Sequence, residues 1–408
     1  MGSSGAPELT AQEMSNIACG GRSRRATILG IGTAVPAHVY EQKSFPDYYF
    51  EITNSNHLVD LKAKFASICE KTSTEKRHMY ISDEWLRANP SVTAYMSTSL
   101  NVRQQVAEEG IPRLGAEAAR NAISDWGKPA SGITHVVFAT TSTGCLPSAD
   151  CVLIKLLGLP PTTKRVMLYQ AGCFGGTTAL RVSKDIAENN PGARVLVVTS
   201  EVMSLVLRGP SESHIGNLVG QAVFGDAAGA VVVGCCPAAD ERPMFELVRA
   251  SQDVIPGTED AVVVKVRQEG VVITMHRDVP LHVSNSVGAI VKSALQEIMP
   301  APAPEMKSDD MFWLLHAGGR GIVDGVEKRL ALREEKLAAT REVMRQYGNT
   351  RSSTVFLAME EMRRRSDEQG MATAGEGLEW GMLIAFGPGL TLETMLLRAL
   401  PIVNHANM

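Results

Sequence analysis

Residues 165–190, RVMLYQAGCFGGTTALRVSKDIAENN, join an apolar strand pattern to an amphipathic helix pattern. The junction is Gly172-Cys173, and small residues follow the cysteine. A helix N-terminus carries unpaired N–H groups and a positive partial charge, which favour a thiolate and lower the pKa of a cysteine there. The stretch therefore predicts a nucleophile at Cys173, while a cysteine packed at a strand–helix junction is the alternative.

The same alternation of strand and helix continues on both sides of this stretch. Apolar runs that predict strands occupy residues 26–36, 134–142, 165–172, 193–201, 227–234, 245–254, 311–318 and 381–389. Continuous apolar runs are typical of strands covered on both faces, and the helical patterns between them predict an α/β fold.

A weak internal repeat divides the chain. Gly172-Cys173 leads into a helix in the first part, and Gly348-Asn349 leads into another in the second. We expect two similar α/β halves packed together, with Cys173 and Asn349 in equivalent positions. The predicted segments are a polar N-terminal tail with a short helix at 1–25, the half with the nucleophile at 26–243, the second half at 244–401, and a tail at 402–408.

Composition limits the function classes. The 408 residues carry a formal net charge of −4, so no basic field for nucleic acid is expected. The seven cysteines include no C-x-x-C pair, and we expect no zinc or other metal site. No apolar run approaches the ~20 residues of a membrane span, and the N-terminus lacks the apolar core of a signal peptide. These features favour a cytoplasmic protein without a membrane span.

A cysteine nucleophile needs a basic neighbour and a group that stabilises an oxyanion. His316 ends the predicted strand MFWLLHAG, and Asn349 lies at the twin helix N-terminus. His214, His276 and His282 are weaker candidates, and a lone histidine is more often structural. We expect Cys173, His316 and Asn349 to converge from three loops.

Several longer stretches resemble the type III polyketide synthases, the chalcone synthase group. They include GCFGGTTALRVSKDIAENNPGARVLVVTSE, RGPSESHIGNLVGQAVFGDAAGAVVVG, FWLLHAGG, YGNTRSSTVFLAMEEMR and AFGPGLTLETMLLR, in order across about residues 25–400. The resemblance implies a thiolase-like αβαβα fold, a homodimer, no cofactor, and starter acyl-CoA and malonyl-CoA as substrates. It implies that Cys173 is acylated by the starter, and that His316 and Asn349 stabilise the enolate formed when malonyl-CoA loses carbon dioxide.

The resemblance also implies roles for residues that the spacing alone does not identify. Phe224 matches the gate phenylalanine beside the cysteine, and Leu146 matches a residue that crosses to the partner subunit. Lys64, Lys71 and Gly321 match residues at the coenzyme A site. Ser67 replaces an arginine of that site, and Arg320 replaces a proline, so we expect Arg320 to contact coenzyme A; a solvated surface arginine is the alternative.

The pocket positions of the family fall on Thr141, Ser142, Met203, Val206, Val264, Ile273, Arg351 and Pro388. Thr141 and Ser142 fit the chalcone synthase pattern. That pattern has threonine at Met203 and Val206, glycine at Val264, phenylalanine at Ile273 and serine at Arg351. These departures predict a product other than a chalcone.

Arg351 has two interpretations. A cation near a helix N-terminus opposes the helix dipole, and a buried cation needs a partner. Arg351 therefore either forms a salt bridge outside the cavity or lines the pocket and holds a polar intermediate.

Three other functions fit parts of the pattern. A ketoacyl synthase that primes fatty-acid synthesis would use the same three residues with an acyl-carrier protein. A papain-like protease also uses cysteine, histidine and asparagine, but the strand–helix alternation disfavours it. A non-catalytic binding partner of such enzymes would not need Cys173, His316 and Asn349 intact.

Overall fold

The computed structural model describes residues 24–296 and 307–402. Most of the predicted tails, 1–23 and 403–408, lie outside the described residues, and the predicted bounds of the two halves remain predictions.

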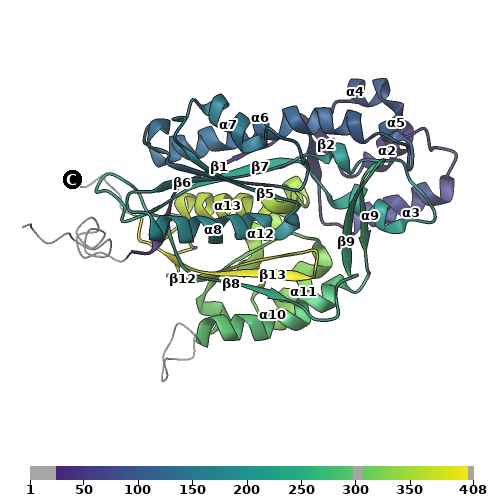
Figure 1. Ribbon diagram of the computed structural model, residues 1–408. Coiled ribbons are helices and arrows are strands. Elements are labelled where there is room, and N and C mark those ends of the chain that lie inside the picture. Colours follow the sequence, from purple (N-terminus) through teal and green to yellow (C-terminus); the bar gives the residue numbers. More distant parts are fainter. Residues whose placement is uncertain (1–23, 297–306, 403–408) are drawn as a thin grey trace, which may run out of the picture.

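Nine strands form one continuous hydrogen-bonded order, β11-β12-β13-β8-β1-β7-β6-β4-β5. In chain order they are β1 (Ala26–Ala34), β4 (His135–Thr140), β5 (Lys164–Tyr169), β6 (Arg194–Glu201), β7 (Ala227–Cys235), β8 (Phe245–Val254), β11 (Phe312–Leu315), β12 (Trp380–Gly387) and β13 (Thr391–Ala399). The order is folded over, so that the strands of the first half lie above those of the second half in Figure 1.

The pairing pattern repeats. In the first half β4 is parallel to β6, β6 is antiparallel to β7, and β7 is antiparallel to β1. In the second half β11 is parallel to β12, β12 is antiparallel to β13, and β13 is antiparallel to β8. β1 and β8 join the two halves through a short antiparallel pairing. The predicted two-half α/β architecture is therefore present.

Helices cover and separate the strands. They are α2 (Phe45–Ile52), α3 (Val59–Glu70), α4 (Asp83–Ala88), α5 (Pro90–Thr93), α6 (Leu100–Trp126), α7 (Ala149–Leu157), α8 (Gly175–Asn189), α9 (Ile215–Val223), α10 (Val279–Gln296), α11 (Arg320–Leu330), α12 (Ala338–Tyr347) and α13 (Thr354–Glu368). α8 and α13 lie between the two layers of strands, α6 and α7 lie outside one layer, and α10 and α11 lie outside the other (Figure 1). The five layers are helix, sheet, helix, sheet and helix.

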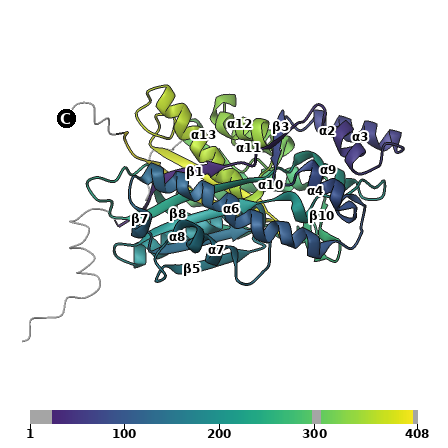
Figure 2. The same cartoon turned by 90° about the horizontal axis from the view of Figure 1, so that it is seen from above.

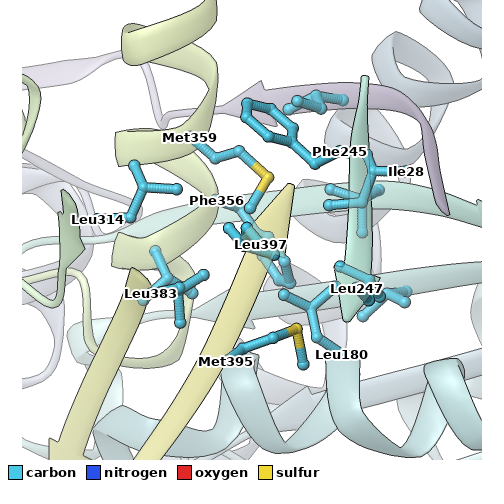
Figure 3. Packing of buried hydrophobic residues seen from close by; sticks show 14 of the residues in the cluster. Ile28, Leu180, Phe245, Leu247, Leu314, Phe356, Met359, Leu383, Met395 and Leu397 are labelled. Atoms are coloured by element: carbon cyan, nitrogen blue, oxygen red, sulfur yellow. The ribbon is translucent and has the colours of Figure 1, made fainter. Parts of the chain in front are cut away.

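The middle layer contains a large apolar core. Figure 3 shows Leu180 of α8 and Phe356 and Met359 of α13 packed against Leu247 of β8 and Leu397 of β13. All five side chains are fully buried. Burial on this scale fixes both central helices, and hence the two loops that precede them.

A smaller region lies at one end of the layers. It contains α2, α3, α4, α5 and α9 and two small two-stranded sheets (Figure 2). One sheet pairs β2 (His38–Glu41) with β3 (Lys76–Met79), with α2 and α3 between them in the chain. The other is a hairpin of β9 (Val262–Arg267) and β10 (Gly270–Met275), which lines the cavity that contains Cys173.

Candidate active site

One cavity of about 280 Å³ brings the predicted catalytic residues together. Cys173, Phe224, His316 and Asn349 all line it. The remaining lining residues are Thr141, Gln170, Gly172, Val206, Val262, Val264, Val266, Val271, Ile273, Met275, Val279, Gly318, Ile322, Arg351, Phe386, Gly387, Pro388 and Leu390. Segments far apart in the sequence therefore meet at this point, as the spacing predicted for the three catalytic candidates.

Cys173 lies in a single 3-10 turn, Gly172–Phe174, immediately before α8. Gly172 has φ of 71°, which favours glycine, and a Cβ atom on Gly176 would lie 2.2 Å from the carbonyl oxygen of Ser352. The small residues after the cysteine therefore let the N-terminus of α8 contact the turn that precedes α13. This close approach places Cys173 beside the Asn349 loop.

The expected lowering of the cysteine pKa is wrong. Burial, reinforced by the Glu201 carboxylate, raises the pKa of Cys173 to about 12. The Arg351 cation and a hydrogen bond with Asn349 act in the opposite direction but do not offset the loss of water. Cys173 keeps part of its surface open to the cavity although the protein around it is dense, so it rests as an accessible neutral thiol.

His316 is fully buried at the end of β11. Its backbone N–H donates to Ile384 O at 2.8 Å, and its ring packs edge-to-face on Phe386 at 5.0 Å between centroids. Burial lowers the pKa of His316 to about 3, so the imidazole is neutral. Neither ring nitrogen has a hydrogen-bond partner among the described residues. Because buried polar atoms are almost always paired, these nitrogens are available to a ligand in the cavity.

Asn349 is held by its backbone and its side chain. Its N–H donates to Val223 O at 2.8 Å, and its own carbonyl accepts from Gly225 N at 3.1 Å. These bonds pair it with Phe224, which is 5% exposed at the end of α9. The Asn349 amide donates to Gly318 O at 3.2 Å, and Gly318 is two residues after His316. The amide and the imidazole therefore reach the cavity from adjacent loops.

Glu201, at the end of β6, accepts hydrogen bonds from several polar groups next to the cavity. It is fully buried and accepts hydrogen bonds from the Thr141 N–H and hydroxyl and from the Ser142 and Ser352 hydroxyls. The Thr141 and Ser142 hydroxyls are thus already engaged. The sequence analysis did not identify Glu201, although a carboxylate that ends the apolar run VLVVTSE was a detectable signal.

Arg351 lines the cavity and is only 4% exposed. Its guanidinium lies 3.7 Å from Glu201 and 3.4 Å from Asp226, another fully buried carboxylate missed from the sequence. It also lies 5.9 Å from the ring centroid of Phe224, within cation–π range. Burial raises the pKa of Asp226 to about 7, against the opposing effect of Arg351. Both interpretations of Arg351 therefore apply in part: it forms ion pairs with two buried carboxylates that do not line the cavity, and its own side chain lines the cavity.

Arg351 also has an unusual backbone. Its φ is 56°, in the left-handed region that longer side chains rarely adopt. The Asn349 side-chain oxygen accepts from the Arg351 N–H at 2.8 Å and supports this turn. The strain is offset by the two ion pairs and ties the position of Arg351 to that of Asn349.

The other predicted pocket positions divide into two groups. Thr141, Val206, Val264, Ile273 and Pro388 line the cavity. Ser142 and Met203 are buried behind the wall and do not, because Ser142 bonds to Glu201 and Met203 packs among Leu205, Val206, Phe224 and Val271.

The predicted coenzyme A and dimer residues lie on the surface. Lys64 of α3 and Lys71 at its C-terminal cap are exposed, and neither lines the cavity. Arg320 and Gly321 are exposed at the start of α11, whose Ile322 does line the cavity. Leu146 is 85% exposed, an unusual state for a leucine.

The described residues contain no cluster of three or more His, Cys, Asp or Glu side chains that could hold a metal ion. Within residues 24–296 and 307–402, no helix is both long and apolar enough to cross a membrane.

Comparison with known families gives two adjoining matches. Residues 12–237 match the family described as chalcone and stilbene synthases, N-terminal domain. Residues 246–401 match the family described as chalcone and stilbene synthases, C-terminal domain. Together the two matches cover most of the chain, and they agree with the thiolase-like α/β fold predicted from the sequence.

Proposed function

Because the chain belongs to the chalcone and stilbene synthase family and is a type III polyketide synthase, an acyltransferase that condenses CoA thioesters, we propose how the cavity performs this reaction. The observation that supports the proposal is that one cavity is lined by a partly exposed thiol and by a buried imidazole whose ring nitrogens have no partner in the described residues.

Loading begins at Cys173. The Cys173 sulfur attacks the thioester carbonyl of a starter acyl-CoA while the neutral His316 accepts the thiol proton. The carbon–sulfur bond to CoA breaks, and the proton passes to the departing CoA thiolate. The product of this step is an acylated Cys173 and free coenzyme A.

Extension takes place in the same cavity. Malonyl-CoA loses its carboxylate as carbon dioxide, and the electron pair moves into the thioester as an enolate. His316 and the Asn349 amide hydrogen-bond the enolate oxygen, while Phe224 and Phe386 exclude water. The enolate carbon attacks the acyl-cysteine, and the Cys173 thiolate leaves. The reaction needs no metal or redox cofactor, because the leaving carbon dioxide supplies the electron pair.

We also propose that the product is not a chalcone, on the basis of three side chains that line the cavity. Val264 and Ile273 stand where chalcone synthases have glycine and phenylalanine, and Arg351 places a cation where they have serine. We propose that these three side chains redirect the growing chain, with Arg351 facing its polar carbonyl groups. The exposed Leu146 supports a homodimer, which would double the chain mass of 43.9 kDa in solution.

The test combines malonyl-CoA labelled in its free carboxyl group with a panel of starter acyl-CoAs. Carbon dioxide release and product masses are measured for the parent protein and for Cys173→Ala, His316→Ala and the control Cys151→Ala, which changes an exposed cysteine of α7. We expect Cys173→Ala to abolish chain extension and His316→Ala to lower decarboxylation about 10²-fold or more. A ketoacyl synthase would instead require a carrier-protein thioester. Unchanged extension in Cys173→Ala would contradict the mechanism.

A further inference from the structure

The β9–β10 hairpin presents one face of aliphatic side chains to the cavity. Register pairs three residues of β9 with three of β10 across the hairpin: Val266 with Val271, Val264 with Ile273, and Val262 with Met275. All six side chains line the cavity that contains Cys173. Alternate residues of a strand point to opposite faces, so this face is uniformly apolar by construction.

The opposite face of the hairpin has another character. Val263, Lys265, Arg267, Val272 and Thr274 line a separate surface groove. The apolar face is therefore not a consequence of a hairpin that is apolar throughout, because the opposite face carries charged and polar side chains. Only the cavity-facing positions are all aliphatic.

Among the described residues, no polar side chain lines the cavity at the end formed by the β9–β10 hairpin. The polar lining groups are Thr141, Gln170, Cys173, His316, Asn349 and Arg351, and they follow β4, β5 and β11 or precede α13. The lining residues that pack near Val271 and Ile273 are Val206 and Phe224, and those near Val262 are Val279, Ile322 and Leu390; all five are apolar. A hydroxyl on the remote end of a starter would thus be buried without a partner, which is unfavourable.

The hairpin end is also incompletely covered. Val264 is 36% exposed and Val266 is 47% exposed, although both line the cavity. A flexible apolar chain that starts at Cys173 would cover this surface and gain free energy for each methylene that it buries. A rigid ring with a polar substituent would leave part of it open.

From this arrangement we propose that the starter is a saturated aliphatic acyl-CoA, whose hydrocarbon chain lies along the Val262, Val264, Val266, Val271, Ile273 and Met275 face. The inference rests on the proposed function and specifies its substrate class. Transfer forms the bond between the Cys173 sulfur and the acyl carbon and breaks the bond between that carbon and CoA.

The first experiment measures loading of Cys173 by mass spectrometry of the intact protein, with butanoyl-, hexanoyl-, octanoyl-, decanoyl-, cinnamoyl- and p-coumaroyl-CoA. We expect kcat/KM for loading to rise by up to about fourfold per added methylene. We expect p-coumaroyl-CoA to load at least about fivefold less efficiently than cinnamoyl-CoA, because its hydroxyl finds no partner. A flat dependence on chain length, or preferred loading of p-coumaroyl-CoA, would overturn the inference.

The second experiment uses adjacent residues on opposite faces of β9. Val264→Asp places a carboxylate on the aliphatic face and should lower the decanoyl-to-acetyl loading ratio about tenfold or more. Val263→Asp makes the same change on the other face and should leave the ratio unchanged. Val264→Thr, nearly equal in shape, should lower the ratio a few-fold and serves if Val264→Asp does not fold. Equal effects of Val264→Asp and Val263→Asp would contradict the proposal.

Failure of the aliphatic substrate and failure of the proposed function give different results. More efficient loading by both aromatic starters than by every aliphatic starter, with normal carbon dioxide release, would reject the aliphatic substrate and leave the proposed function intact. Absence of loading by every acyl-CoA, together with no carbon dioxide release, would reject the proposed function itself.

Discussion

The two ends of the active-site cavity differ in charge and in burial. At the reactive end, Arg351 is buried between Glu201 and Asp226, beside Cys173 and His316. At the hairpin end, the wall consists of aliphatic side chains that are partly open to solvent. From this difference we expect mutations at the hairpin end to alter the choice of starter and to leave the decarboxylation of malonyl-CoA intact.

The largest expected effect is on folding stability, which should depend far more on the reactive end of the cavity than on the hairpin end. At pH 8, above the raised pKa of Asp226, Arg351→Met leaves the buried Glu201 and Asp226 without a counter-charge, so we expect the free energy of unfolding to fall by about 3–5 kcal/mol. Val264→Met, at the partly exposed hairpin end, should change it by less than about 1 kcal/mol. Urea denaturation followed by circular dichroism measures both. Equal losses in the two variants would show that the ionic end does not carry the expected stability.

The next effect is a pH dependence confined to the reactive end. The pKa of Asp226 is raised by burial from 3.8 to about 7, so the folded protein keeps a proton that the unfolded chain releases. Between these values stability should fall as pH rises, by at most about 1.4 kcal/mol per pH unit from this group. Below about pH 4 the carboxyl group is protonated in both states, and this contribution is constant.

Asp226→Asn tests that dependence, because an amide does not titrate. The free energy of unfolding of the variant relative to the parent should become more favourable to the variant between pH 5 and pH 7, measured by urea denaturation. Val264→Asn, at the hairpin end, is the control and should show the slope of the parent. A parent and an Asp226→Asn variant with parallel pH profiles would argue against a proton on Asp226.

Much of the fold could be predicted from the sequence. The long apolar runs at 193–201 and 227–234 correspond closely to β6 and β7, because strands covered on both faces have few polar interruptions. β13 was not predicted as a strand, since its glutamate and threonines break the apolar run TLETMLLRA. Glu393 is nevertheless buried, because Arg181 pairs with it from α8. Such a long-range pairing has no local signal.

Prediction of the site from the sequence was limited in the same way, by interactions that depend on the whole fold. The convergence of Cys173, His316 and Asn349 followed from their positions at strand and helix ends. The direction of the Cys173 pKa shift did not, because burial depends on the whole fold, whereas the helix N-terminus is visible locally. The alternation in VVVKVR predicted nothing about the cavity, since the sequence does not say which face of that hairpin turns inward.

The smallest effect concerns a residue at the surface rather than in either end of the cavity. Arg320 is exposed at the first position of α11 and lies 3.3 Å from Asp324, which also accepts from Arg341 at 2.8 Å. Ile322, two residues later, lines the cavity. We propose that Arg320 contacts a CoA phosphate. We expect Arg320→Ala to raise the KM for malonyl-CoA about two- to fivefold and to leave kcat nearly unchanged, as for loss of an exposed contact to phosphate. Arg333→Ala removes a comparable exposed arginine, paired with Asp309, and should change neither constant. The KM effect should shrink as salt is added, because an exposed charge contact is screened. If the two variants have the same KM, Arg320 is a solvated surface arginine, and the lost arginine at Ser67 has no replacement on this helix.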